Sequence, residues 1–142
     1  MASDFEAQLR AVSLRVTRPR LAVLAALHDH PHIDTDTVIA LVRAEHPPVS
    51  RQAVYDVLRA LTDTGLVRRI RSAGAIARYE SRVADNHHHV VCRSCGAIAD
   101  VDCAVGHGPC LHTSNAHGFA VDEVEVVYRG ICPTCTTEQT PQ

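Results

Sequence analysis

Two Cys-x-x-Cys pairs, Cys92/Cys95 and Cys132/Cys135, enclose a stretch of 36 residues in the last third of the chain. Each pair places two sulfur atoms on one tight turn, so two pairs can complete the tetrahedron of thiolates that structural zinc takes. Gly96 follows the first pair and permits a sharp turn. A dithiol redox pair or unbonded cysteines are the alternatives. We predict a structural zinc that joins the start of the C-terminal domain to its end.

Two further cysteines, Cys103 and Cys110, lie between these pairs. Free cysteine is among the most buried residue types, so both suit small buried side chains. A peroxide-sensitive pair is the alternative. We expect that neither residue binds the structural zinc.

The sequence carries no signal for export or for a membrane. It begins Met1-Ala2-Ser3-Asp4, without a basic stretch that leads into an apolar one. No apolar run approaches the roughly 18 residues that a membrane span needs. Six cysteines in a chain that is not exported favour metal or redox chemistry over a disulfide framework. We therefore expect a cytoplasmic protein with no membrane partner.

The first 82 residues combine helical periodicity with a later pattern of strands. Ser50 suits a helix N-cap, the apolar residues from Val54 to Leu61 follow the spacing of one helix face, and Gly65 stands where a helix commonly ends. We expect four helices: one over 4–12, one from a cap at Thr17 to about residue 30, one from a cap at Asp34 or Thr35 to before Pro47, and one from Ser50 to about residue 64. Two strands, over 66–71 and 75–80, should follow around a turn at 72–74. Helices followed by a β-hairpin indicate a winged helix over residues 1–82.

A short polar hinge at 83–86 leads to a second domain over 87–142. Strands are expected at His87–Cys92, Ala97–Val101 and Phe119–Tyr128, with a short, broken helix within 103–117 and a polar, mobile tail after Cys135. The predicted fold class is α+β: a winged helix-turn-helix followed by a small α/β domain with a structural zinc site.

Three consecutive histidines, His87, His88 and His89, open the second domain. Alternate side chains of a strand share a face, so His87 and His89 point one way and His88 the other. Two imidazoles on one face make half of a metal site, and a polar strand end is the alternative. Further ligands are available in Glu80 at the end of the hairpin, in Asp100, and in His32 between the second and third helices.

Arginine supplies all the fixed positive charge, because the chain has no lysine. Residues 1–86 hold 12 arginines against 10 acids, whereas residues 87–142 hold 2 against 6. The guanidinium fork suits phosphate and guanine edges, although a solvated arginine-bearing face is the alternative. The candidate DNA contacts are Ser50, Arg51, Gln52 and Tyr55 on the fourth helix, Arg68 and Arg69 in the hairpin, and Arg15, Arg18 and Arg20 around the start of the second helix.

Several of these segments together resemble the ferric uptake regulator (Fur) family from about residue 9 to residue 136. The resemblance is strongest to the actinobacterial FurA/CatR group, whose members control catalase-peroxidase genes. The segments are Leu14-Arg15-Val16-Thr17-Arg18-Pro19-Arg20, Ser50-Arg51-Gln52-Ala53-Val54-Tyr55-Asp56-Val57-Leu58, Gly65-Leu66-Val67, Arg78-Tyr79-Glu80, Asp85-Asn86-His87-His88-His89-Val90-Val91-Cys92-Arg93-Ser94-Cys95-Gly96, Ala99-Asp100-Val101-Asp102-Cys103 and Cys132-Pro133-Thr134-Cys135.

The resemblance implies a homodimer that binds DNA through its winged helices and dimerises through the C-terminal domain. It implies zinc on the four paired cysteines, and Tyr55 and Arg15 at positions that touch DNA. Asp56 stands where many relatives have arginine, which is compatible with an operator other than the common iron box. The resemblance also implies a regulatory metal on His32, Glu80, His87, His89 and Asp100. Relatives often carry a third site, whose positions here are Asn86, His88, His107 and Val124, and two of these are poor ligands.

These features predict a metal-dependent transcriptional repressor that binds a double-stranded operator, takes no small-molecule substrate and is not an enzyme. Fe²⁺ or Mn²⁺ is the expected regulatory ion, with Zn²⁺ as an occupant in vitro. We further expect a peroxide response and control of a catalase-peroxidase gene. A zinc- or nickel-responsive regulator, a zinc enzyme and a zinc-stapled interaction module are the rivals, of which the enzyme conflicts with a closed four-thiolate site.

Overall fold

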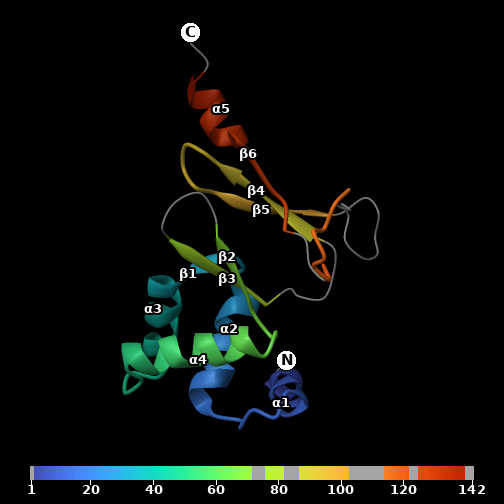
Figure 1. The fold of residues 1–142 in the computed structure, drawn as a ribbon. Coiled ribbons are helices and arrows are strands. Elements are labelled where there is room, and N and C mark those ends of the chain that lie inside the picture. Colours follow the sequence, from blue (N-terminus) through green and yellow to red (C-terminus); the bar gives the residue numbers. More distant parts are fainter. Residues whose placement is uncertain (1, 72–75, 82–86, 103–113, 122–124, 140–142) are drawn as a thin grey trace. The chain divides into compact units, whose positions relative to one another are not determined.

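The structure is a computed structural model, and it describes residues 2–71, 76–81, 87–102, 114–121 and 125–139. The chain forms two compact units, Met1–Val83 and Ala84–Gln142. Figure 1 shows the elements of each unit. The expected hinge at 83–86, the turn at 72–74, and Cys103 and Cys110 lie outside the described residues.

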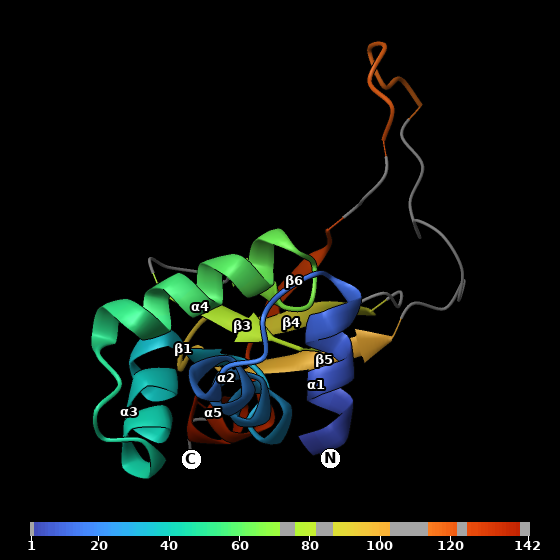
Figure 2. The same cartoon turned by 90° about the horizontal axis from the view of Figure 1, so that it is seen from below.

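Four helices make up most of the first unit, close to the ranges that the sequence predicts. Helix α2 lies between α1 and α3 in both views (Figure 1, Figure 2). A core of buried aliphatic side chains, among them Leu24, Leu27, Val38, Leu58 and Leu61, holds the helices together. The helices are α1 (Ala2–Ala11), α2 (Arg18–Asp29), α3 (Thr35–Glu45) and α4 (Arg51–Asp63).

Each helix start predicted from a capping residue is confirmed. The side chain of Thr17 accepts a hydrogen bond from the backbone N–H of Arg20, and Asp34, not Thr35, caps α3 in the same way. The Ser50 hydroxyl accepts from the N–H of Ala53 at 3.0 Å. Each of these bonds satisfies a donor that a helix N-terminus leaves unpaired.

Helix α4 ends at Asp63, and Gly65 lies just beyond it, where the sequence predicts a glycine that terminates the helix. Gly65 has a φ of +80°, in the left-handed region that favours glycine. The N–H of Leu66 donates to the carbonyl of Leu61 at 3.0 Å, and the N–H of Gly65 donates to that of Thr62 at 3.1 Å. This Schellman arrangement turns the chain from α4 directly into the following hairpin.

A small antiparallel sheet completes the first unit. Strands β2 (Arg68–Arg71) and β3 (Ala77–Glu80) form the predicted hairpin, and β3 is the central strand. A two-residue strand that the sequence does not predict, β1 (Ile33–Asp34), pairs with the other side of β3, where Ile33 lies opposite Tyr79. Helices followed by this sheet form the winged helix-turn-helix that the sequence predicts.

The second unit holds a three-stranded sheet of order β5-β4-β6. The central strand β4 (His87–Cys92) pairs antiparallel with β5 (Ile98–Asp102) and parallel with β6 (Val127–Gly130). The first two strands match the prediction within one residue.

Two predictions for the second unit are wrong. Among the described residues of the expected strand Phe119–Tyr128, only Val127 and Tyr128 are extended in the sheet, and Phe119 and Val121 are exposed without a strand partner. The tail after Cys135 is predicted to be polar and mobile, but its described residues, 136–139, belong to helix α5 (Pro133–Gln139). Pro133 suits the first position of a helix, and polarity alone does not prevent a helix. None of the helices in the described ranges is long and apolar enough to cross a bilayer.

Candidate metal centres and nucleic-acid interface

The four paired cysteines come together in the second unit. Cys92 ends β4, Cys95 lies in the turn after it, Cys132 precedes α5 and Cys135 lies within that helix. Their four sulfur atoms all lie within 4.8 Å of one another, and the sulfurs of Cys95 and Cys132 are 3.7 Å apart. A tetrahedral zinc with sulfur at about 2.3 Å holds its sulfurs roughly 3.8 Å apart. The cluster therefore fits a structural zinc site.

The environment of these sulfurs favours a mixture of thiolate and thiol in the absence of a cation. The pKa of Cys92 falls to about 6, first because the backbone N–H of Cys132 donates to its sulfur and then because that of Cys95 does. A hydrogen bond with Ser94 lowers the pKa of Cys135, but the neighbouring sulfurs of Cys132, Cys95 and Cys92, together with burial, outweigh it and raise the value to about 12. Four adjacent thiolates need a bound cation, because like charges oppose each other's ionisation.

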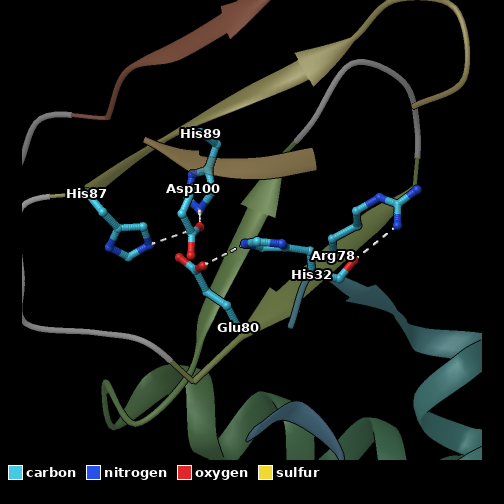
Figure 3. Close-up of polar contacts among 6 residues, drawn as sticks. All are labelled: His32, Arg78, Glu80, His87, His89 and Asp100. Carbon is cyan, nitrogen blue, oxygen red and sulfur yellow. Dashed lines mark hydrogen bonds and ion pairs between the residues drawn. The ribbon is translucent and has the colours of Figure 1, made fainter. Parts of the chain in front are cut away.

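A second group of metal-binding side chains lies on the sheet of the second unit (Figure 3). His87 and His89 share one face of β4, and Asp100 on β5 lies opposite His89 in the strand register. One carboxylate oxygen of Asp100 lies 3.4 Å from His89 Nε2 and 3.7 Å from His87 Nε2. Both imidazoles are almost fully buried. Such separations suit nitrogen and oxygen ligands at about 2.1 Å from a shared ion.

The middle histidine of the run differs from its neighbours. His88 is also buried, and its Nε2 is a buried side-chain atom with no hydrogen-bond partner among the described residues. The alternation of β4 turns it away from the face of His87 and His89. It is therefore not part of their group.

A third group lies in the first unit, where His32 and Glu80 face each other (Figure 3). The Nε2 of His32 is 3.3 Å from a Glu80 carboxylate oxygen, and the Glu80 side chain is 1% exposed. His32 has a φ of +67°, and its backbone is held on both sides: its N–H donates to Tyr79 and its carbonyl accepts from Arg78. The backbone is thus fixed where the imidazole meets the carboxylate. Each of the five regulatory ligands predicted from the sequence belongs to one of these two groups, each described within its own unit.

The candidate base-reading residues occupy the exposed first turns of α4. Arg51 forms an ion pair with Asp36 of α3, with Nη2 at 3.0 Å from Oδ1, and the hydrogen bond to Asp36, followed by one to Tyr55, raises the pKa of Arg51. The Gln52 amide donates to Asp56 at 2.9 Å. Tyr55 is 42% exposed. Neither Asp36 nor the acceptor role of Asp56 was predicted from the sequence, although the i, i+4 spacing of Gln52 and Asp56 is a recognisable signal.

The other arginines predicted to contact DNA surround the start of α2 and line the hairpin. Arg18 is the first residue of α2, and Arg20 donates from Nη1 to the backbone carbonyl of Arg15 at 2.8 Å. In β2, Arg69 is exposed and Arg68 is half-buried. These positions are compatible with phosphate contacts.

Comparison with known proteins places this geometry in a family. Residues 11–129 match the model of the ferric uptake regulator family. The transcriptional regulator FurA of Mycobacterium tuberculosis is 63% identical over 137 residues, which cover 96% of this chain and 93% of FurA. This confirms the resemblance to the FurA group.

Solved structures show the same fold. The ferric uptake regulator of Helicobacter pylori, described as having three functional metal-binding sites, aligns with a TM-score of 0.70 at 14% identity, over 97% of this chain and 93% of that one. The peroxide stress regulator of Campylobacter jejuni aligns with a TM-score of 0.66 at 24% identity, over 95% and 98%. These relatives are regulators and not enzymes, as the sequence predicts. The chain belongs to the ferric uptake regulator family and is a transcriptional regulator.

Proposed function

We propose that this protein is a metal-dependent repressor that binds a double-stranded DNA operator as a homodimer, in the cytoplasm. The observation that carries the proposal is the convergence of His87 and His89 on one carboxylate oxygen of Asp100. Three convergent nitrogen and oxygen ligands in a DNA-binding family suit an exchangeable divalent ion better than a purely structural role. The closed four-cysteine cluster is the separate, structural zinc site.

The regulatory ion would be Fe²⁺ or Mn²⁺, held by His32, Glu80, His87, His89 and Asp100. His32 and Glu80 supply one nitrogen and one carboxylate from the first unit, so the two groups together offer a donor set that neither holds alone. Only six residues separate Glu80 from His87, and seven chain steps span at most about 25 Å. An ion bound by both groups would fix the orientation of the winged helix relative to the second unit.

The coupling between metal and operator follows from linkage. An ion that favours the DNA-competent orientation must in turn be bound more tightly when DNA is present. In a dimer, the same ion would set the spacing at which two α4 helices meet two half-sites. Exposed apolar side chains of the second unit support its role in dimerisation, because a second copy would cover them: Phe119, Val121, Tyr128 and Ile131.

A titration of the zinc-loaded protein with Fe²⁺, Mn²⁺, Zn²⁺ and Ni²⁺ identifies the regulatory metal. The affinity of the protein for an operator fragment is measured at each metal concentration. We expect Fe²⁺ and Mn²⁺ to strengthen operator binding by at least about tenfold, within the usual range of allosteric coupling. A response to Zn²⁺ or Ni²⁺ alone would favour the zinc- or nickel-responsive alternative. Operator binding that is independent of every metal would overturn the proposal.

We also propose a peroxide response and control of a catalase-peroxidase gene, which the resemblance to the FurA group and the peroxide regulator of similar fold motivate. Peroxide treatment of the Fe²⁺ form should release the operator and add one oxygen atom to His32 or His87, as mass spectrometry of peptides would show. The Mn²⁺ form is the matched control and should stay unmodified, because Mn²⁺ does not reduce peroxide in this way. Release of the operator without any modified histidine would contradict the assignment.

A further inference from the structure

The first unit contains a cavity of about 320 Å³ that lies outside the groups of metal-binding side chains. It lies between α4, the β2–β3 hairpin and the start of α3. The walls come from the base-reading helix and from the wing, the two elements that a winged helix presents to DNA. The charged and aromatic side chains among its lining residues are Tyr55, Arg59, Asp63, Arg69 and Tyr79.

Two guanidinium groups at this cavity are available to a ligand. Arg59 of α4 and Arg69 of β2 are both exposed. Within the part of the chain that the structure describes, no side chain or carbonyl forms a hydrogen bond or ion pair with either of them. Arg10 and Arg51, by contrast, are each paired with a carboxylate. Arginine beside a cavity and without an internal acceptor suits an anion from outside.

The charge at the cavity selects the kind of anion. Two guanidinium groups against the single carboxylate of Asp63 leave one net positive charge, which a singly charged phosphodiester neutralises. Tyr55 and Tyr79 also line this cavity, and a tyrosine hydroxyl can donate to a phosphate oxygen.

The position of the cavity identifies the phosphodiester as part of DNA. Helix α4 enters the major groove and a wing contacts the adjacent backbone, so the strand between them must pass the space that separates these two elements. We propose that Arg59 and Arg69 clamp one backbone phosphate of the bound DNA in this cavity. The inference rests on the proposed function, and it adds Arg59 to the DNA contacts and gives Arg69 a defined partner.

The clamp is tested with the metal-loaded protein and operator duplexes that each carry one neutral methylphosphonate. A methylphosphonate at the clamped position should weaken the binding of wild-type protein by about tenfold, which is the scale of one charge-assisted hydrogen bond. At that position the Arg59→Ala/Arg69→Ala double variant should lose nothing further. Because the substitutions remove the clamp from both protomers of the dimer, the double variant should bind operator and unrelated DNA more weakly by about the square of that factor, and the slope of log affinity against log salt should become shallower by about 1.8.

Matched variants distinguish a phosphate clamp from base contacts and from a loss of folding. Arg43→Ala removes an arginine from the last turn of α3, outside the cavity, and should leave the methylphosphonate profile unchanged. Thermal unfolding checks that each variant folds. A double variant that loses affinity for the operator alone would indicate base contacts and overturn the clamp, as would an unchanged sensitivity to methylphosphonate.

Three outcomes bear on the source of the phosphate, on the proposed function and on the clamp itself. Inorganic phosphate, compared with chloride at equal ionic strength, should compete no better against wild type than against the double variant; selective competition would assign the cavity to a free anion and overturn the clamp. Wild-type protein that binds no DNA under any metal would overturn both the clamp and the repressor function. A double variant that binds the operator as tightly as wild type, and with the same dependence on metal, would overturn the clamp but not the repressor function.

Discussion

Replacement of Cys135 by serine should remove one equivalent of tightly bound zinc per chain and unfold the Ala84–Gln142 unit. Structural zinc contributes on the order of 10–16 kcal/mol in zinc-finger peptides at neutral pH, which is comparable to the whole stability of an ordinary domain. Cys135 is buried, and its sulfur belongs to the cluster in which all four lie within 4.8 Å. Zinc content after dialysis and the circular dichroism melting curve measure the two effects.

The matched control is the double variant Cys103→Ser/Cys110→Ser, which removes the two cysteines that do not belong to either Cys-x-x-Cys pair. It should retain its zinc and the melting transition of the second unit. The helical signal of the first unit should survive in Cys135→Ser, because the buried core of α1–α4 involves none of the four cysteines. Full zinc content in Cys135→Ser would show that the cluster is not the site of the structural ion.

Replacement of His89 by alanine should abolish the response of operator binding to Fe²⁺ or Mn²⁺ while the structural zinc remains. His89 Nε2 is the closer of the two imidazole nitrogens to Asp100, at 3.4 Å. Loss of a residue that only orients a ligand weakens metal affinity by about 10–100-fold, so loss of a ligand itself should exceed that range. The metal concentration at half-maximal operator binding, measured by fluorescence anisotropy, is the readout, and His87→Ala should behave in the same way.

His88→Ala is the matched control for this prediction. His88 is a neighbour on the same strand, is similarly buried, and points to the other face of β4. Its replacement should preserve the metal response even where it lowers the melting temperature. If His88→Ala and His89→Ala were equally insensitive to metal, the packing of β4, and not ligation, would explain the loss.

Local interactions explain which parts of the fold can be predicted from the sequence. The starts of α2, α3 and α4 depend on a cap three residues from its partner, and the end of α4 depends on a glycine with positive φ. Strand β1 depends instead on pairing with β3, some 45 residues away, and two residues carry no pattern of their own. The strand expected from Phe119 does not begin there, because Phe119 and Val121 are exposed and exposed apolar side chains can follow the same period as buried ones.

The same distinction applies to the candidate sites. The cysteine pairs and the face shared by His87 and His89 follow from spacing alone, because a turn and a strand have fixed geometry. The pairing of Arg51 with Asp36 joins residues on two helices and needs the tertiary packing of α3 on α4. The sequence likewise cannot show that Arg59 has no hydrogen-bond acceptor among the described residues. From the sequence alone, Arg59 is expected to be an ordinary solvated arginine on a helix face.

The parallel pairing of β4 with β6 has a consequence for the variability of the chain. Cys92 lies opposite Gly130 in the strand register, so the two strands deliver both cysteine pairs to one end of the sheet. The geometry of the sulfurs therefore depends on the strand ends and not on the length of the chain that connects them. A longer connection would add only about 0.6 kcal/mol of closure entropy for each doubling. Insertions and deletions in the segment between Cys95 and Cys132 can therefore accumulate during evolution without changing the coordination of the structural ion.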